Sequence, residues 1–178
     1  MAAIDPRARP RTPRATALTL ALVALGSPSA LPEAAQATEA AATRGLPPAV
    51  ARTREALLRL ASHHDYDGLA RLALAPGKGF VYHLGFEQRR PAAYWRQRAA
   101  RGEAPLLKLV ALMRLRPVQS RGVFLWPAAA MNPDETAWAD LKGLYPATRI
   151  ERFRQEGYTG WRTGIDAQGR WTMFLAGS

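Results

Sequence analysis

The hydrophobic positions after residue 46 recur every three or four residues, which predicts helices along most of the chain. Pro47-Pro48 opens the first helix, because proline suits the first helical turn, and this helix ends near His63-His64. Further helices with the same period are bounded by proline, glycine or capping residues: a short one capped by Asp65 or Asp67 and ending at Ala73, residues 92–101, residues 106–116, a helix containing Trp138, Leu141 and Leu144, and one more turn at 150–155.

Strands are indicated where apolar residues alternate with a period of two. Residues 80–84 and 123–126 are two such strands, and the segments 158–165 and 170–176 flank Asp166–Gly169, a loop of hairpin length. Helices come early and paired strands late, which predicts an α+β fold. We therefore expect a single domain, residues 47–178, with N-terminal helices packed on a small antiparallel sheet of about four strands that ends in a C-terminal β-hairpin.

The first 37 residues have the pattern of a secretory signal peptide. An arginine-rich leader precedes an apolar run over residues 15–26, and the small-x-small tripeptide Ala35-Gln36-Ala37 follows. The run is too short for a membrane span, which needs about 20 apolar residues, and it is apolar all round rather than amphipathic as in a transit peptide. We expect cleavage after Ala37, a flexible tether over residues 38–46, and a periplasmic or secreted mature chain without a transmembrane helix.

Composition and charge restrict the classes of partner that we expect the protein to bind. The 178 residues include no cysteine, and 25 Lys plus Arg against 14 Asp plus Glu give a net charge of +11. Cleavage would remove four arginines and two acids and leave +9 on the mature chain. A positive field attracts polyanions, which favours an anionic envelope polymer, a lipid headgroup or an envelope protein as the partner. Nucleic acid is not expected for an exported chain, and the alternative is that the charge serves solubility only.

Aromatic residues beside arginine or proline are the candidate ligand contacts. Tyr and Trp rings stack on sugars or other rings, and a neighbouring arginine holds an anion. The same large rings also fill the core of a small domain, so composition alone leaves both interpretations open. The candidate ligand-binding residues are Tyr94, Trp95, Trp126, Trp161 and Arg162.

An acid–base site is the alternative. His83 stands four residues before Glu87, and a histidine–carboxylate pair with Glu87 or Asp65 could move a proton. The chain lacks cysteine and a Gly-x-Ser-x-Gly motif, so no nucleophile is identified. The run His63–Asp67 is the only concentration of metal-ligand types, and it has no second ligand pair at a recognised spacing. No metal and no other cofactor are therefore expected.

Several motifs carry a resemblance to known families. The segments ASHHDYDGLARLAL and FVYHLGF are similar to the entry of NTF2-like α+β domains, in which helices and a curved sheet form a cone-shaped pocket. AAYWRQ, FLWPAAA, GYTGWRTGIDAQGRW and MFLAGS resemble a family of secreted or periplasmic bacterial proteins without an assigned activity. That family ends in Ala-Gly-Asp, whereas Ser178 stands in the last position here. Over residues 48–178 the resemblance implies export and one domain, and it supplies no catalytic residue.

The sequence thus predicts an exported, non-catalytic domain that binds an anionic or ring-bearing envelope ligand or a partner protein. The alternative is a small periplasmic hydrolase or isomerase with an NTF2-like pocket that uses His83 and a nearby carboxylate.

Overall fold

A computed structural model describes residue 43 and residues 45–75, 79–82 and 90–177. By its internal contacts the chain divides into two units, Met1–Ala30 and Leu31–Ser178, and all described residues belong to the second. The predicted signal segment 1–37 lies outside the described residues, as do residues 38–42 and 44 of the predicted tether. Within the described part of the chain, no helix is long and apolar enough to cross a bilayer.

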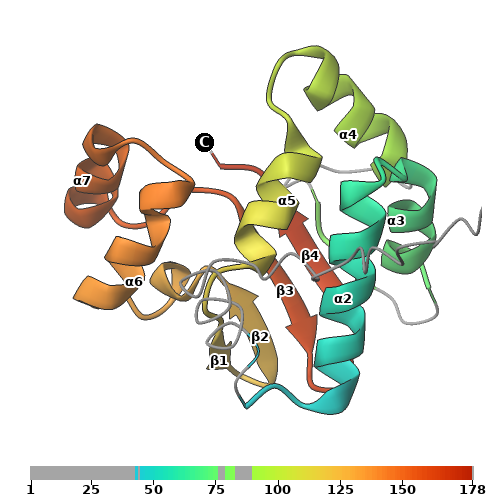
Figure 1. Ribbon diagram of the computed structural model, residues 1–178, viewed down its shortest axis with the longest axis horizontal. Helices are drawn as coiled ribbons and strands as arrows, with labels where there is room; N and C mark the ends of the chain where they lie inside the picture. The colour runs from blue at the N-terminus through green and yellow to red at the C-terminus, as the bar shows by residue number, and fades with distance from the viewer. Residues whose placement is uncertain (1–42, 44, 76–78, 83–89, 178) are drawn as a thin grey trace, which may run out of the picture. The chain divides into compact units, whose positions relative to one another are not determined.

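Helices and a four-stranded antiparallel sheet make up the described fold, which confirms the predicted α+β class (Figure 1). The strands lie in the order β1-β2-β3-β4. In chain order the elements are α2 (Pro48–Ser62), α3 (Tyr66–Ala73), α4 (Pro91–Ala100), α5 (Pro105–Met113), β1 (Val118–Ser120), β2 (Val123–Trp126), the 3₁₀ turn η1 (Ala128–Ala130), α6 (Glu135–Asp140), the 3₁₀ turn η2 (Leu141–Gly143), α7 (Ala147–Glu156), β3 (Arg162–Asp166) and β4 (Trp171–Leu175).

The ends of the helices follow from local chemistry. Proline occupies the first turn of α2, α4 and α5, where its missing N–H costs nothing because that group has no partner within the helix. Asp65 caps α3 by accepting the N–H of Gly68 at 2.7 Å, and Asp134 caps α6 by accepting the N–H of Ala137 at 2.7 Å. The cap at Asp65 confirms the start that the sequence predicts for α3.

The predicted C-terminal hairpin is the pair β3–β4, and β2 lies beside β3. The first strand, β1, was not predicted, because three residues are too few to show an alternation. It forms a hairpin with β2 through Arg121 and Gly122, whose φ angles of 48° and 78° are both left-handed. Two left-handed residues are what a tight hairpin turn requires.

Of the predicted strand at residues 80–84, the described residues 80–82 are not a strand of the sheet. Val81 makes one isolated parallel bridge to Met173 on β4, and residues 83 and 84 lie outside the described residues. The chain bends at Tyr82, whose ring packs 5.3 Å from that of Tyr94 and whose hydroxyl accepts the N–H of Arg90 at 3.3 Å. These contacts tie Tyr82 to the start of α4, whereas Val81 exchanges backbone hydrogen bonds with Thr172 and Phe174 of β4.

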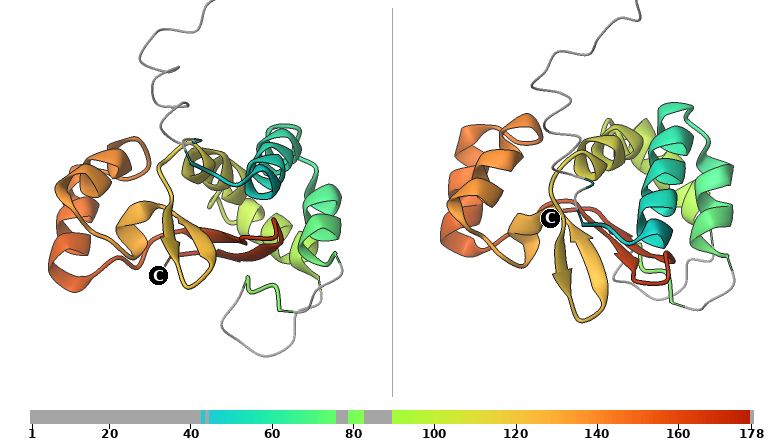
Figure 2. Two further views of the ribbon diagram at one scale, coloured as in Figure 1. Left: turned by 90° about the horizontal axis from the view of Figure 1, so that it is seen from below. Right: turned by 60° about the horizontal axis from the view of Figure 1, so that its bottom comes forward.

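The main core lies between the sheet and the helices. Figure 2 shows α2 and α5 on one face of the sheet, and both contact β3. Aromatic rings fill the part of the core near β4: Trp95 of α4 lies 5.6 Å from Trp171 and 5.9 Å from Phe174, measured between ring centroids. A second, smaller cluster joins η1, α6, η2 and α7 and consists of Ala129, Ala137, Trp138, Leu141, Ile150 and Phe153.

The tip of the β3–β4 hairpin rests on the start of α2. Gly169 has φ +82°, and its carbonyl accepts the hydroxyl of Thr53 at 2.6 Å. A Cβ on this glycine would lie 2.7 Å from the carbonyl oxygen of Ala49. Real Cβ atoms do not approach backbone so closely, so glycine is required here for both its backbone angle and its small size.

We expect Gly169→Ala to destabilise the protein more than Gly122→Ala does. At both positions the left-handed backbone costs an alanine about 1 kcal/mol of stability. A Cβ on Gly122, however, would meet nothing within 4 Å. The clash with Ala49 adds about 1–3 kcal/mol at position 169. Urea unfolding of the two variants measures the difference, and equal losses would show that the hairpin tip does not press on α2.

Candidate ligand-binding pocket

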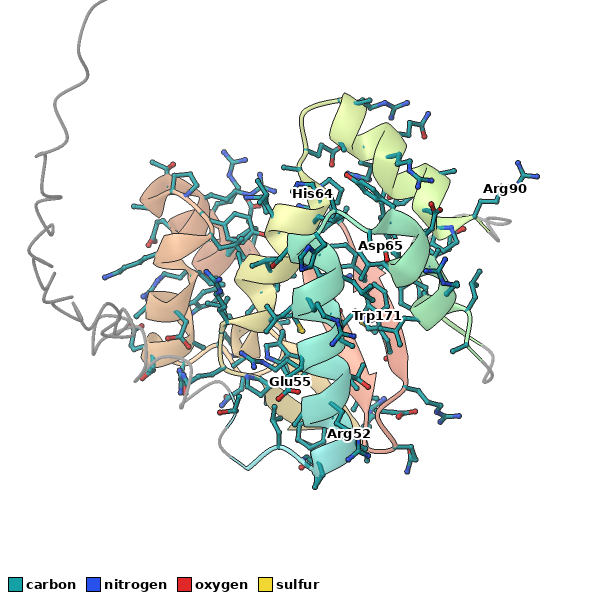
Figure 3. The ribbon with its side chains drawn as sticks, turned by 45° about the vertical axis from the view of Figure 1, so that its right-hand side comes forward. Arg52, Glu55, His64, Asp65, Arg90 and Trp171 are labelled. Carbon is teal, nitrogen blue, oxygen red and sulfur yellow. The ribbon has the colours of Figure 1, made fainter. Side chains whose placement is uncertain are left out.

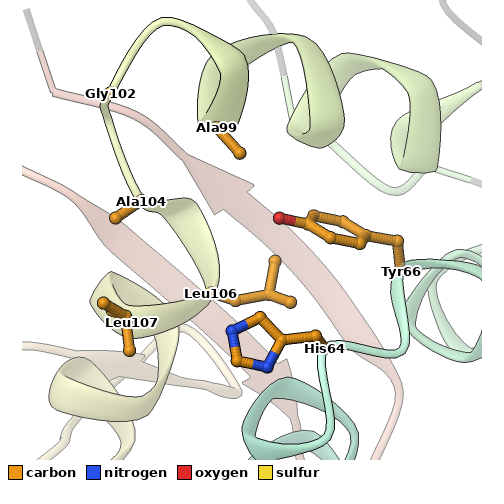
Figure 4. Close-up of a pocket in the computed structure, with 7 residues that line it drawn as sticks. All are labelled: His64, Tyr66, Ala99, Gly102, Ala104, Leu106 and Leu107. Atoms are coloured by element: carbon orange, nitrogen blue, oxygen red, sulfur yellow. The ribbon is translucent and has the colours of Figure 1, made fainter.

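A pocket of about 240 Å³ opens between the α2–α3 corner and the α4–α5 connection (Figure 4). Its polar groups are the imidazole of His64 and the hydroxyl of Tyr66, and the rest of the lining is small or apolar. The lining residues are His64, Tyr66, Ala99, Gly102, Ala104, Leu106 and Leu107. Apolar walls with a few converging polar groups are typical of small-molecule sites.

The α2–α3 corner places His64 on the pocket wall. The N–H of His64 donates to the carbonyl of Ala61 at 3.1 Å, and that of Asp65 donates to the carbonyl of Leu60 at 2.9 Å. This pair of bonds defines the Schellman motif, which ends many helices. The residue that His64 occupies in this motif has a left-handed backbone and is usually glycine. Here it is histidine, with φ 55°, at the end of α2 and directly before Asp65 (Figure 3).

Tyr66 is the first residue of α3, and its ring lines the pocket together with His64 (Figure 4). The guanidinium of Arg96 lies 5.3 Å from the centroid of that ring. Arg96 also donates to Asp67 at 2.7 Å, and this bond lowers the pKa of the Asp67 carboxyl. Arg96 and Asp67 thereby connect α4 to the first turn of α3, next to the pocket.

The opposite wall is the short connection from α4 to α5. Gly102 has φ +84°, and Ala104 has φ +47°, which is a left-handed conformation that alanine rarely adopts. Pro105 follows directly and opens α5, whose start has no side-chain cap. The exposed Leu107, with 63% of its surface accessible, stands at the rim.

Unfavourable backbone is concentrated at this pocket. Among the described residues, three that are not glycine have a positive φ: His64, Ala104 and Arg121. Two of these, His64 and Ala104, line the pocket from opposite sides. Strained backbone persists only where the surroundings enforce it, and it clusters at functional sites. Arg121 serves the β1–β2 turn, and His64 serves both the Schellman ending of α2 and the pocket wall.

The pocket also lies in the most basic part of the chain. Residues 90–121, which contain α4, the connection and α5, hold eight basic residues and a single acid, Glu103. Arg90, at the start of α4, extends away from the fold (Figure 3). None of the seven described lining residues is a carboxylate. Two acids from outside this range, Asp67 and Asp140, pair with Arg96 and Arg116, and the excess of basic residues that is left favours a negatively charged ligand.

The predicted ligand residues Trp95 and Trp126 lie in the core. Both are 0% exposed, and their indole nitrogens have no hydrogen-bond partner among the described residues. The two rings fill volume in the main core and present no face to solvent. This placement matches the alternative that the composition also allows, namely large rings used as core.

The predicted residues Tyr94 and Trp161 lie beside Arg98, and Arg162 follows Trp161 as the first residue of β3. The Arg98 guanidinium lies 5.5 Å from the ring centroids of both Tyr94 and Trp161. Trp161 is 7% exposed, while Tyr94 and Arg162 are half-buried. None of the three lines the pocket, so a direct role in ligand binding stays a prediction.

Tyr145 and Tyr158 hold the backbone of Trp161 in place. The N–H of Trp161 donates to the hydroxyl of Tyr145 at 2.7 Å, and the hydroxyl of Tyr158 donates to the Trp161 carbonyl at 2.5 Å. Burial raises the pKa of both tyrosines, so both hydroxyls stay protonated at neutral pH. A Cβ on Gly160 would lie 2.5 Å from the Tyr145 oxygen, which explains the glycine before Trp161.

The alternative acid–base residues are placed only in part. Asp65 caps α3 and lies 3.9 Å from Arg71, whereas His83 and Glu87 lie outside the described residues. In the described part of the chain, no group of three or more His, Asp or Glu side chains could hold a metal ion. A second depression of about 390 Å³ lies at the start of α7, and its charged lining residues are Lys142, Glu151 and Arg154.

No protein-family model, curated protein or solved structure matches this chain. The resemblance to NTF2-like domains and to secreted bacterial proteins therefore stays a prediction, and the geometry alone identifies the pocket. The sequence indicates His63 and His64 as candidate metal ligands and does not by itself locate the pocket. The usable signal was a helix that ends without glycine immediately before an aspartate cap.

We expect His64→Gly to stabilise the protein by about 1 kcal/mol, because glycine adopts the left-handed conformation without the penalty that histidine carries. The matched variant His63→Gly should instead lose stability. Residue 63 has an ordinary φ of −88°, so glycine relieves no strain there and only increases the conformational entropy of the unfolded chain. Urea unfolding of both variants measures the two effects. A loss for His64→Gly as large as that for His63→Gly would contradict the strain at this corner.

Proposed function

We propose that this chain is an exported, non-catalytic binding domain whose pocket receives a small ring-bearing anion. The observation that carries the proposal is the placement of two strained residues, His64 and Ala104, on facing walls of one apolar pocket. A conformation that costs stability is retained where it shapes a site. The predicted signal segment over residues 1–37 supports the export part of the proposal.

The walls favour a flat, apolar ligand. The methyl groups of Ala99 and Ala104, the side chain of Leu106 and the ring of Tyr66 surround the cavity. Ligand pockets commonly measure about 300–1,000 Å³. A pocket of about 240 Å³ therefore suits a molecule of one or two rings rather than a polymer chain.

The charge of the ligand follows from its surroundings. The imidazole of His64 and the hydroxyl of Tyr66 can both donate a hydrogen bond to a carboxylate or a similar group. The basic excess over residues 90–121 stabilises negative charge at this place. A cationic ligand would be repelled by the same residues.

A binding role suits the pocket better than catalysis does. His64 is the only lining residue, among those described, that commonly acts as a general base, and the neighbouring Asp65 is committed to capping α3. The described lining residues therefore contain no histidine–carboxylate pair. The alternative with His83 and Glu87 concerns residues outside the described part of the chain and stays a prediction.

We expect the protein to bind 2-naphthoate with a Kd of about 1 mM or tighter, since a ligand of about 13 non-hydrogen atoms gains about 0.3 kcal/mol per atom. The neutral isostere 2-naphthamide should bind several-fold more weakly, and the preference for the acid should fall as salt is added. Calorimetric titration of the protein with both ligands measures this. Absence of binding, or equal affinity for the two, would contradict the proposed function.

Leu107→Asp provides the matched test in the protein, because it places a carboxylate at the rim without disturbing the core. This substitution should weaken the binding of 2-naphthoate about tenfold. Met131→Asp, at a residue that is 55% exposed and does not line the pocket, is the control and should leave the affinity unchanged. Equal effects of the two variants would place the bound anion elsewhere.

A further inference from the structure

The side chain of Arg98 contacts three residues, Tyr94, Glu103 and Trp161. Its Nη1 donates to the hydroxyl of Tyr94 at 2.7 Å, and its Nε donates to a carboxylate oxygen of Glu103 at 2.6 Å. Its Nη2 forms an ion pair with the same oxygen of Glu103. The rings of Tyr94 and Trp161 each lie 5.5 Å from the guanidinium.

These contacts hold Arg98 in one place. The side chain is only 21% exposed, and that of Glu103 is 33% exposed. Ion pairs at this depth are screened less than those on an open surface, and the two bonds to one carboxylate fix the direction of the guanidinium. Trp161 comes from the segment just before β3, so Arg98 links the α4–α5 connection to the sheet.

The backbone of the connection depends on the same residue. The carbonyl of Arg98 accepts the N–H of Arg101 at 3.0 Å and that of Glu103 at 3.2 Å. The carbonyl of Ala99 accepts the N–H of Gly102 at 2.9 Å. Glu103 is therefore attached to Arg98 through both its backbone and its side chain, and the next residue, Ala104, is the strained residue on the pocket wall.

We propose that Arg98 and Glu103 are positioning residues that hold the Ala99–Ala104 wall of the pocket and thereby set its affinity for the ligand without touching it. This inference rests on the proposed function of the pocket. Tyr94 and Trp161, which the sequence predicts as ligand contacts, act in this arrangement through Arg98. Neither Arg98 nor Glu103 is among the lining residues.

Glu103→Gln separates positioning from simple electrostatics. The substitution removes the single acid of residues 90–121, so charge alone would make 2-naphthoate bind more tightly. Loss of the ion pair would instead loosen the wall and weaken binding. We expect at least a fivefold increase in the Kd of 2-naphthoate, and a similar fold-increase for the neutral 2-naphthamide, because the wall serves both ligands.

The experiment combines calorimetric titration with amide hydrogen exchange on the full chain. Exchange at Gly102 and Glu103 should become faster in Glu103→Gln and in Arg98→Lys, which keeps the charge but loses the planar guanidinium. Exchange in the core strand β3 should stay unchanged, which separates a local effect from general destabilisation. The control is Glu135→Gln, which breaks the exposed pair of Glu135 with Arg154 and should change neither quantity.

Four outcomes decide the inference. Wild-type affinity together with wild-type exchange in Glu103→Gln would overturn it, as would tighter binding of 2-naphthoate. Weaker binding of both ligands with faster local exchange supports it. If the wild-type protein binds neither ligand, the proposed function fails, and the exchange at Gly102 and Glu103 alone then decides whether the pair holds the connection.

Discussion

The left-handed backbone at His64 is the constraint on which the arrangement of the first helices depends. It lets the chain leave α2 and enter α3 within three residues, because the Asp65 N–H bonds back to Leu60 while the Asp65 carboxylate caps α3. α3 thereby comes to lie against α2, α4 and β4. The same corner, facing the α4–α5 connection, forms the pocket, so the turn that organises the fold also presents the imidazole.

Charge and aromatic residues are divided between two places in the fold. The aromatic rings of Trp95, Trp171 and Phe174 lie in the core, where they stabilise the packing of α4 on β4. The basic residues concentrate on α4, the connection and α5. Between these two regions stands Arg98, which is basic but stacked on aromatic rings, and it connects the pocket wall to the sheet.

Much of the fold could be predicted from local signals, because proline starts, aspartate caps and the Asp166–Gly169 turn act within a few residues. Strand β1 could not, because its pairing depends on the turn at Arg121–Gly122 rather than on its own three residues. The burial of Trp126 and the pocket beside His64 depend on contacts between distant segments. The sequence shows where the large aromatic rings stand, but only tertiary packing decides which of them are buried.

The central claim is that a ring-bearing anion binds between His64 and the start of α5, and intermolecular nuclear Overhauser effects test it most directly. With 2-naphthoate bound, we predict contacts from the naphthalene protons to the methyl groups of Leu106, Leu107 and Ala104, all of which line the pocket. Contacts confined to Ile150 and Ala147, in the depression at the start of α7, would contradict the claim and place the ligand there instead.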